Sequence, residues 1–182
     1  MKNLLLIILL CGASLASGNS DYHTLYIIQV HAIIKPIDKV DVQFKLFASH
    51  LSLIESSNDW KVVNSLGMMG KYQFSPATLE ILGYHNITPE RFKADPSIFP
   101  EAMQEQALQD LIQHNQNSLK KFASYIGQVI NGTLITKAGL LGAAHLAGVG
   151  GVQKFLTSAH NATDCNGASV QRYLTEFQNY NV

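Results

Sequence analysis

The sequence predicts a mainly helical α+β fold, in which a single helical domain carries a small irregular or β region. The chain of 182 residues has the length of one compact domain. Hydrophobic residues make up 47% of it and charged residues only 14%, which is too apolar for a disordered chain. Apolar residues recur at helical spacing along most of the chain, and Ser or Thr followed by Pro marks two helix starts.

The first 18 residues are typical of a secretory signal. Lys2 precedes a short apolar run, and small residues follow it as far as Gly18. We expect cleavage after Ala16 or Gly18, with residues 1–18 as the signal and residues 19–182 as the domain, in the periplasm or outside the cell. Lipidation at Cys11 is not expected, because Leu10 is bulky where a lipoprotein signal needs a small residue.

Charge and motif content argue against several classes of partner. The 13 basic and 13 acidic residues leave no net charge, so we expect no nucleic-acid partner. The histidines are dispersed and no phosphate-binding loop is present, so we expect neither a metal nor a cofactor. Cys165 lies in a polar, turn-like stretch without a sequence-local activator, and we expect a loop cysteine rather than a nucleophile.

The first expected helix covers residues 38–55, with Asp38 as its N-cap. Its apolar stripe repeats at alternating steps of four and three and consists of Val40, Phe44, Phe47, Leu51 and Ile54. The preceding residues 21–35 fit a strand or a helical extension. An irregular loop or small sheet is expected after the helix, around Gly67 and Gly70.

Further helices are expected along the rest of the chain. Ser75-Pro76 opens a helix that Gly83 closes, and Thr88-Pro89 opens another. A long helix follows Pro100 and ends near Gly127. The final expectations are a helix over 136–147, a turn forced by Gly148, Gly150 and Gly151, a short helix over 152–156, and a last helix over 168–177.

Glu55 is the residue with the clearest chemical potential. It follows Leu51 by one helical turn, so it projects from nearly the same face as the apolar stripe. Apolar neighbours and the negative end of the helix dipole both disfavour a charged carboxylate. An acid that keeps its proton can protonate the leaving oxygen of a sugar. From this helix alone, Glu55 is better explained as a solvated residue at a helix end than as a catalytic acid.

Four motifs that follow one another along the chain favour a catalytic role for Glu55 instead. They are Glu55-Ser56, then Gly67-Met-Met-Gly-Lys-Tyr-Gln-Phe74 followed by Ser75-Pro76, then Ala143-Ala-His-Leu-Ala-Gly148, and finally Tyr173-Leu174. With them the chain resembles the lysozyme-like lytic transglycosylases over residues 43–177. The resemblance implies cleavage of the β-1,4 bond between N-acetylmuramic acid and N-acetylglucosamine, with Glu55 as catalytic acid and 1,6-anhydromuramyl ends as products.

The resemblance also implies which residues bind substrate, namely Ser56, Gly70, Tyr72, Gln73, His145, Gly148 and Tyr173. The implied partners are peptidoglycan glycan strands, and an envelope-spanning machine is a further candidate. We expect a monomer.

Each motif has a physical reason to contact a sugar, and some have a packing alternative. Gly70 lets the backbone approach a sugar ring closely. The amide of Gln73 suits acetamido groups, whereas Tyr72 fits a groove and a core equally well. His145 and Leu146 stand where the family usually has tyrosine and asparagine. His145 either bonds substrate or packs inside the fold.

Two alternatives to a lyase stay open. A hydrolytic muramidase of the same fold needs a second carboxylate, which Asp59 or Glu80 could supply. A catalytically silent peptidoglycan-binding module is the other, favoured by the neutral charge and the lost asparagine. The retained Glu55, Ser56 and Gln73 argue against the silent module.

Overall fold

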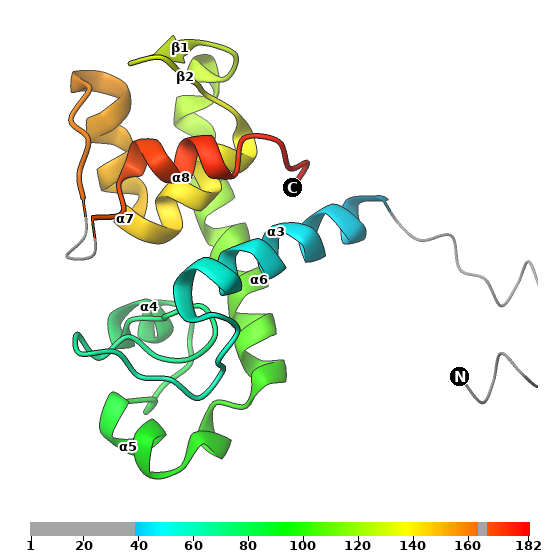
Figure 1. Ribbon diagram of the computed structural model, residues 1–182, viewed down its shortest axis with the longest axis vertical. Coiled ribbons are helices and arrows are strands. Elements are labelled where there is room, and N and C mark those ends of the chain that lie inside the picture. Colours follow the sequence, from blue (N-terminus) through cyan, green and yellow to red (C-terminus); the bar gives the residue numbers. More distant parts are fainter. Residues whose placement is uncertain (1–38, 164–166) are drawn as a thin grey trace, which may run out of the picture. The chain divides into compact units, whose positions relative to one another are not determined.

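Helices dominate the residues that the computed structural model describes, 39–163 and 167–182, and the described residues from Val40 onward form one unit (Figure 1). The expected signal, residues 21–35, Asp38 and Cys165 lie outside the described residues. Within the described ranges, no helix is long and apolar enough to cross a membrane.

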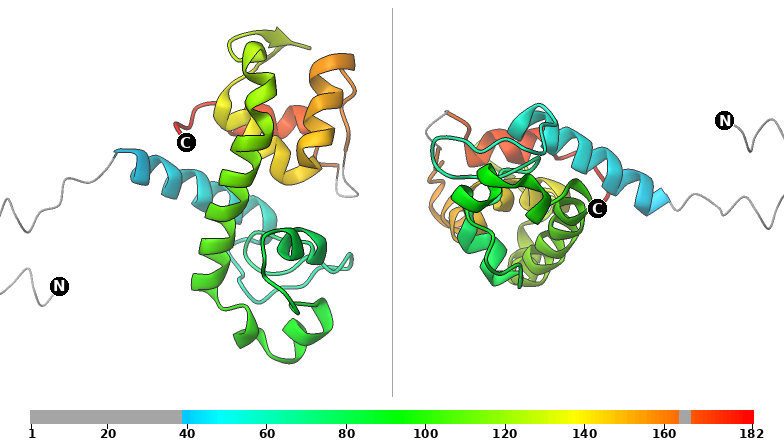
Figure 2. Two further views of the ribbon diagram at one scale, coloured as in Figure 1. Left: turned by 180° about the vertical axis from the view of Figure 1, so that it is seen from behind. Right: turned by 90° about the horizontal axis from the view of Figure 1, so that it is seen from below.

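The elements follow one another as α3 (Lys39–Ser56), α4 (Pro76–Ile81), α5 (Pro89–Ala94), η1 (Pro96–Ile98), α6 (Glu101–Leu119), η2 (Lys120–Tyr125), β1 (Val129–Ile130), β2 (Thr133–Leu134), α7 (Lys137–Ser158) and α8 (Val170–Glu176). Helix α6 runs from the part that holds α4 and α5 to the part that holds α7 and α8 (Figures 1 and 2). Helix α3 crosses between these two parts.

The predicted helix starts are confirmed by their caps. The Ser75 hydroxyl accepts a hydrogen bond from the Thr78 amide at 3.0 Å, and Pro76 occupies the first turn of α4. Gly83 follows that helix with φ of +87°, a conformation that favours glycine. The Thr88 hydroxyl caps α5 in the same way.

The predicted long helix after Pro100 is confirmed at its start and differs at its end. The α-helix stops at Leu119, and a 3₁₀ helix continues to Tyr125. Gly127 then turns the chain with φ of +88°. The predicted end near Gly127 is therefore the end of the 3₁₀ segment rather than of α6.

Helix α7 is kinked at a single glycine. Gly148 alone within it leaves the helical conformation, with φ of 65° and ψ of 172°, so the turn predicted through three glycines was too long. Gly139 and Gly142 have a different role: a Cβ on Gly139 would lie 2.6 Å from the Leu174 carbonyl oxygen, and one on Gly142 would lie 2.4 Å from the Phe177 ring. These two glycines allow α7 to pack directly against α8.

The two-stranded sheet lies at a different place from the one predicted. Strands β1 and β2 pair antiparallel with Val129 opposite Leu134, joined by Asn131 and Gly132, which both have positive φ. Near the end of α3 only isolated bridges form, from Val63 to Met69 and from Met69 to Phe74. The loop after Glu55 is therefore mostly irregular.

The core joins the helices through fully buried aromatic and aliphatic side chains. Helix α3 contributes Phe47 and Leu51 from the predicted stripe. Phe155 and Phe177 come from the α7 and α8 region, and Phe99 comes from the segment before α6. Burial of these side chains fixes α3 and α8, the two helices that carry Glu55 and Tyr173.

Candidate active site

A cleft of about 820 Å³ contains Glu55. Its walls come from the end of α3, the segment from Asn64 to Leu82, one face of α6, the kinked part of α7 and the start of α8. Some of these elements lie near the start of α6 and others near its end. The cleft therefore lies between the part that holds α4 and α5 and the part that holds α7 and α8. Only 15% of the Glu55 side chain is exposed to solvent.

Two side chains approach the same carboxyl oxygen of Glu55, and one of them forms a hydrogen bond with it. The Tyr173 hydroxyl donates a hydrogen bond to Oε1 at 2.6 Å. His145 Nε2 lies 3.7 Å from the same atom. Helices α3, α7 and α8 thus bring together three residues that are up to 118 positions apart in sequence.

His145 connects the cleft to the loop that carries Gln73. Its Nε2 lies 2.9 Å from the Tyr72 carbonyl oxygen, which can only accept, so Nε2 carries a hydrogen. The side chain is 6% exposed, and Nδ1 is buried with no hydrogen-bond partner among the described residues. His145 thus lines the cleft and also holds the Tyr72 backbone in place.

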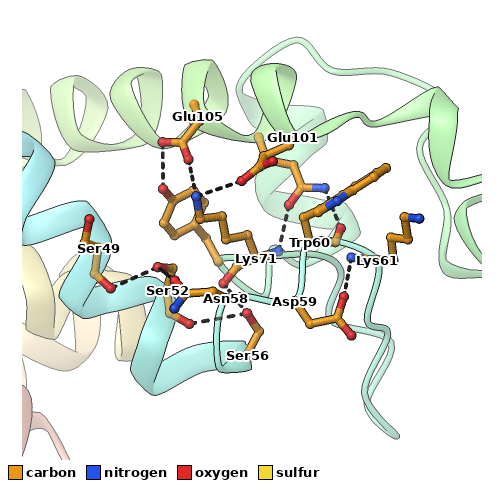
Figure 3. Close-up of polar contacts among 12 residues, drawn as sticks. Ser49, Ser52, Ser56, Asn58, Asp59, Trp60, Lys61, Lys71, Glu101 and Glu105 are labelled. Carbon is orange, nitrogen blue, oxygen red and sulfur yellow. Dashed lines mark hydrogen bonds and ion pairs between the residues drawn. The ribbon is translucent and has the colours of Figure 1, made fainter. Parts of the chain in front are cut away.

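The loop that follows Glu55 is anchored to α3 and α6 by polar contacts (Figure 3). The Ser56 hydroxyl donates to the Lys71 carbonyl oxygen at 2.8 Å. The buried Gln104 amide accepts from the Lys71 backbone N–H at 2.7 Å and donates to the Trp60 and Phe99 carbonyl oxygens, each at 2.8 Å. Three irregular segments therefore meet at one side chain of α6.

A second group of contacts holds the same loop from outside. Lys71 Nζ lies 2.6 Å from Glu105 and 3.0 Å from Glu101. Burial lowers the pKa of Lys71, but hydrogen bonds and charge attraction from these two glutamates outweigh it and raise the pKa. The Lys71 ammonium thus remains charged and keeps the loop tied to α6.

Tyr72 does not line the cleft, so its predicted role as a substrate-binding side chain needs correction. The residue is 1% exposed, and its hydroxyl donates to Glu105 Oε2 at 2.7 Å. Burial and the contact with Glu105 raise the pKa of this hydroxyl. Its packing against Phe74, with ring centres 6.1 Å apart, shows that the core alternative describes the side chain.

Ser56 and Gly70, two other residues predicted to contact substrate, do not line this cleft. Ser56 uses its hydroxyl on the backbone of Lys71. Gly70 has φ of +72°, and a Cβ there would lie 2.3 Å from Gln104 Oε1. Only glycine leaves room for the Gln104 side chain at this position, whereas the sequence suggested that the glycine leaves room for a sugar.

Gln73, His145, Gly148 and Tyr173 do line the cleft, together with Glu55. Gln73 has φ of +51°, and its amide donates to the Gly70 carbonyl oxygen at 2.9 Å. This contact leaves the Gln73 side-chain oxygen as an acceptor at the cleft.

The two other carboxylates considered from sequence do not line the cleft. Asp59 is exposed and accepts a hydrogen bond from the Lys61 backbone N–H at 2.9 Å. Glu80 is exposed and contacts His85 at 2.7 Å. Among the residues that the structure describes, Glu55 is the only carboxylate in the cleft wall.

A polar strip of α6 and η2 that was not predicted from the sequence also lines the cleft, and it consists of His114, Asn115, Ser118 and Lys121. Their spacing places them on one helical face, which the sequence could have shown. That this face meets a cleft depends on tertiary packing. Arg172 of α8 was missed for the same reason.

Within residues 39–163 and 167–182, no group of three or more His, Cys, Asp or Glu side chains is placed to hold a metal ion. Comparison with models of known protein families, with curated proteins and with solved structures finds no match to this chain.

Proposed function

We propose that this chain has a lysozyme-like fold and cleaves the β-1,4 bond between N-acetylmuramic acid and N-acetylglucosamine in peptidoglycan. The observation that carries the proposal is Glu55: a largely buried carboxyl group, bonded by Tyr173, in the wall of a cleft of about 820 Å³. The proposal places the enzyme in the periplasm or outside the cell, where this substrate lies.

In the first step Glu55 acts as a general acid. Tyr173 donates to Oε1, which leaves Oε2 as the oxygen to hold the transferable proton. That proton passes to the glycosidic oxygen as its bond to the muramyl C1 breaks. The substrate's own acetamido oxygen stabilises the positive charge that develops at C1.

In the second step Glu55, now a carboxylate, acts as a general base. It takes the proton from the 6-hydroxyl of the muramyl residue while that oxygen bonds to C1. The product is a 1,6-anhydro ring, no water is consumed, and Glu55 regains its proton. During this step the Tyr173 hydroxyl stabilises the carboxylate through its hydrogen bond of 2.6 Å.

The carboxylate content of the cleft supports a lyase over a hydrolase. A two-carboxylate hydrolase needs a second acidic group on the other side of the scissile bond. Asp59 and Glu80 both lie outside the cleft wall and have other partners. A mechanism with one acidic residue therefore fits the described residues better.

The products from purified sacculi test the proposal. Mature protein is incubated with sacculi, and the released fragments are read by mass spectrometry. Anhydromuramyl ends support the proposal, whereas reducing muramyl ends would indicate a hydrolase. Intact glycan with retained protein would indicate a silent binding module and would overturn the proposed reaction.

A further inference from the structure

The hairpin formed by β1 and β2 carries apolar side chains on both of its faces. Val129 lies opposite Leu134, and the next pair, Ile130 with Thr133, points to the other face. Thr133 is buried and Ile130 packs against the core, so theirs is the inner face. Val129 and Leu134 form the outer face and are 66% and 43% exposed. Because the outer face of such a hairpin is ordinarily polar, an exposed apolar pair on it indicates a contact surface.

This surface lies at one end of the described unit, with η2 and the second half of α7 beside it (Figures 1 and 2). The Asn131 side chain donates to the Ala159 carbonyl oxygen at 3.3 Å, which ties the hairpin turn to the end of α7. Ile126, directly before the hairpin, is 46% exposed and adds a third apolar side chain. Ile126, Val129 and Leu134 are called the hairpin patch below.

The charges in the segments around the hairpin patch have one sign. Residues 111–163 contain no acidic residue and four lysines, Lys120, Lys121, Lys137 and Lys154. All four are exposed, and none forms an ion pair with a described residue. The first two begin η2, which leads into the hairpin, and the third begins α7, which follows it. On α8, which packs against β2, Arg172 and Glu176 lie 3.7 Å apart and offset each other.

An apolar patch bordered by lysines fits the surface of an anionic lipid bilayer. Apolar side chains enter the headgroup region, while ammonium groups meet the lipid phosphates. A second copy fits less well, because a symmetric contact would bring the same lysines face to face with no carboxylate between them. Three apolar side chains are also few for the buried centre of a stable protein interface. For shallow insertion supported by charge attraction they are enough.

We propose that the hairpin patch and the lysines around it bind anionic phospholipids at a membrane surface. Val129 and Leu134 supply the apolar insertion, and the four lysines supply the attraction to phosphate. The chain as a whole has no net charge, so this attraction is local to one end of the unit. The proposal goes beyond the proposed function and does not rest on it.

Co-sedimentation with vesicles tests the proposal. The mature protein is mixed at low salt with vesicles of phosphatidylcholine alone, or of phosphatidylcholine and phosphatidylglycerol in equal parts. One double variant combines Val129→Ser with Leu134→Ser. Its matched control combines Leu46→Ser with Leu53→Ser on α3, where the two leucines are 51% and 57% exposed.

A second pair of double variants tests the charges. Lys120→Glu with Lys137→Glu reverses two lysines near the hairpin patch, and leaves Lys121 intact because it lines the cleft. The matched control is Lys61→Glu with Lys93→Glu, which changes the net charge equally at exposed sites distant in sequence from the hairpin. Melting temperatures of all variants show whether each remains folded.

We expect binding to the phosphatidylglycerol vesicles only, and weaker binding when salt is added. Each hairpin variant should lower the bound fraction about tenfold in its partition coefficient, while both controls bind as the wild type does. Equal binding to the two kinds of vesicle, or binding to neither, would overturn the proposal. So would equal losses in the variants and their controls. Concentration-dependent dimers that the serine variant abolishes, without vesicle binding, would assign the patch to a second copy instead.

Discussion

At the scale of single residues, Tyr173 is the direct partner of the proposed acid. Its hydroxyl donates to Glu55 at 2.6 Å, and the contact gains strength when Glu55 becomes a carboxylate. Tyr173→Phe keeps the buried ring, so the fold should persist while turnover on peptidoglycan falls about tenfold or more. Turnover equal to wild type, with an unchanged melting temperature, would rule out a supporting role for this hydroxyl.

His145 is predicted to act through the Tyr72 backbone. His145→Gln can keep a donor for the carbonyl oxygen now 2.9 Å away, whereas His145→Leu leaves that buried acceptor without its partner. We expect the leucine variant to lose about 1–3 kcal/mol of stability in urea unfolding, and the glutamine variant to lose less. Turnover should follow the same order. If glutamine and leucine impair turnover equally at unchanged stability, the imidazole itself takes part in the reaction.

At the scale of elements, the kink of α7 depends on Gly148. Its φ of 65° with ψ of 172° belongs to a region that only glycine adopts readily. Gly148→Ala should therefore lower the free energy of unfolding by about 1–3 kcal/mol. Gly150→Ala is the matched control, because it is helical with open space around its Cβ, and it should raise stability by about 0.5–1 kcal/mol. Equal effects of the two variants in thermal unfolding would contradict the assigned kink.

The loop that supports the site depends on Gln104. Gln104→Leu removes the partners of three backbone groups at Lys71, Trp60 and Phe99, and should cost about 2–5 kcal/mol. Gln113→Leu replaces an exposed glutamine of the same helix and should change stability by no more than about 0.5 kcal/mol. Denaturant unfolding measures both. A loss for Gln104→Leu no larger than that of its control would show that the loop is held by other contacts.

Elements with local signals could be predicted from the sequence, and those that depend on contacts between distant residues could not. The Ser75 and Thr88 caps and the apolar stripe of α3 are local, so α3, α4 and α5 were predicted well. The Asn131-Gly132 pair is also a local hairpin signal, which was overlooked. Two features depend on packing between distant segments: the inward orientation of the Tyr72 side chain, and the contact of one face of α6 with the cleft. Glu55 and Tyr173 were predicted only through the order of motifs.

At the scale of the whole molecule, stability should decline in alkali. Burial and the contact with Asp110 raise the pKa of Tyr84 to about 12, and the pKa of Tyr72 and Lys71 is also raised. A pKa raised in the folded state means that the unfolded chain loses its proton first, so stability is full below about pH 10 and declines from there to about pH 12. Tyr84→Phe should be less stable at neutral pH, because it loses the hydrogen bond to Asp110, but should show a shallower decline in this window. An equally steep decline would exclude Tyr84 as a contributor.

In the proposed reaction, Glu55 transfers a proton twice within one turnover. Mass spectrometry of glycan released from sacculi, by the wild type and by Glu55→Gln side by side, tests it most directly. We predict anhydromuramyl ends from the wild type and a fall of about 10²–10⁴-fold in their release by the variant, at an unchanged or higher melting temperature. Equal release of these ends by both proteins would contradict the claim.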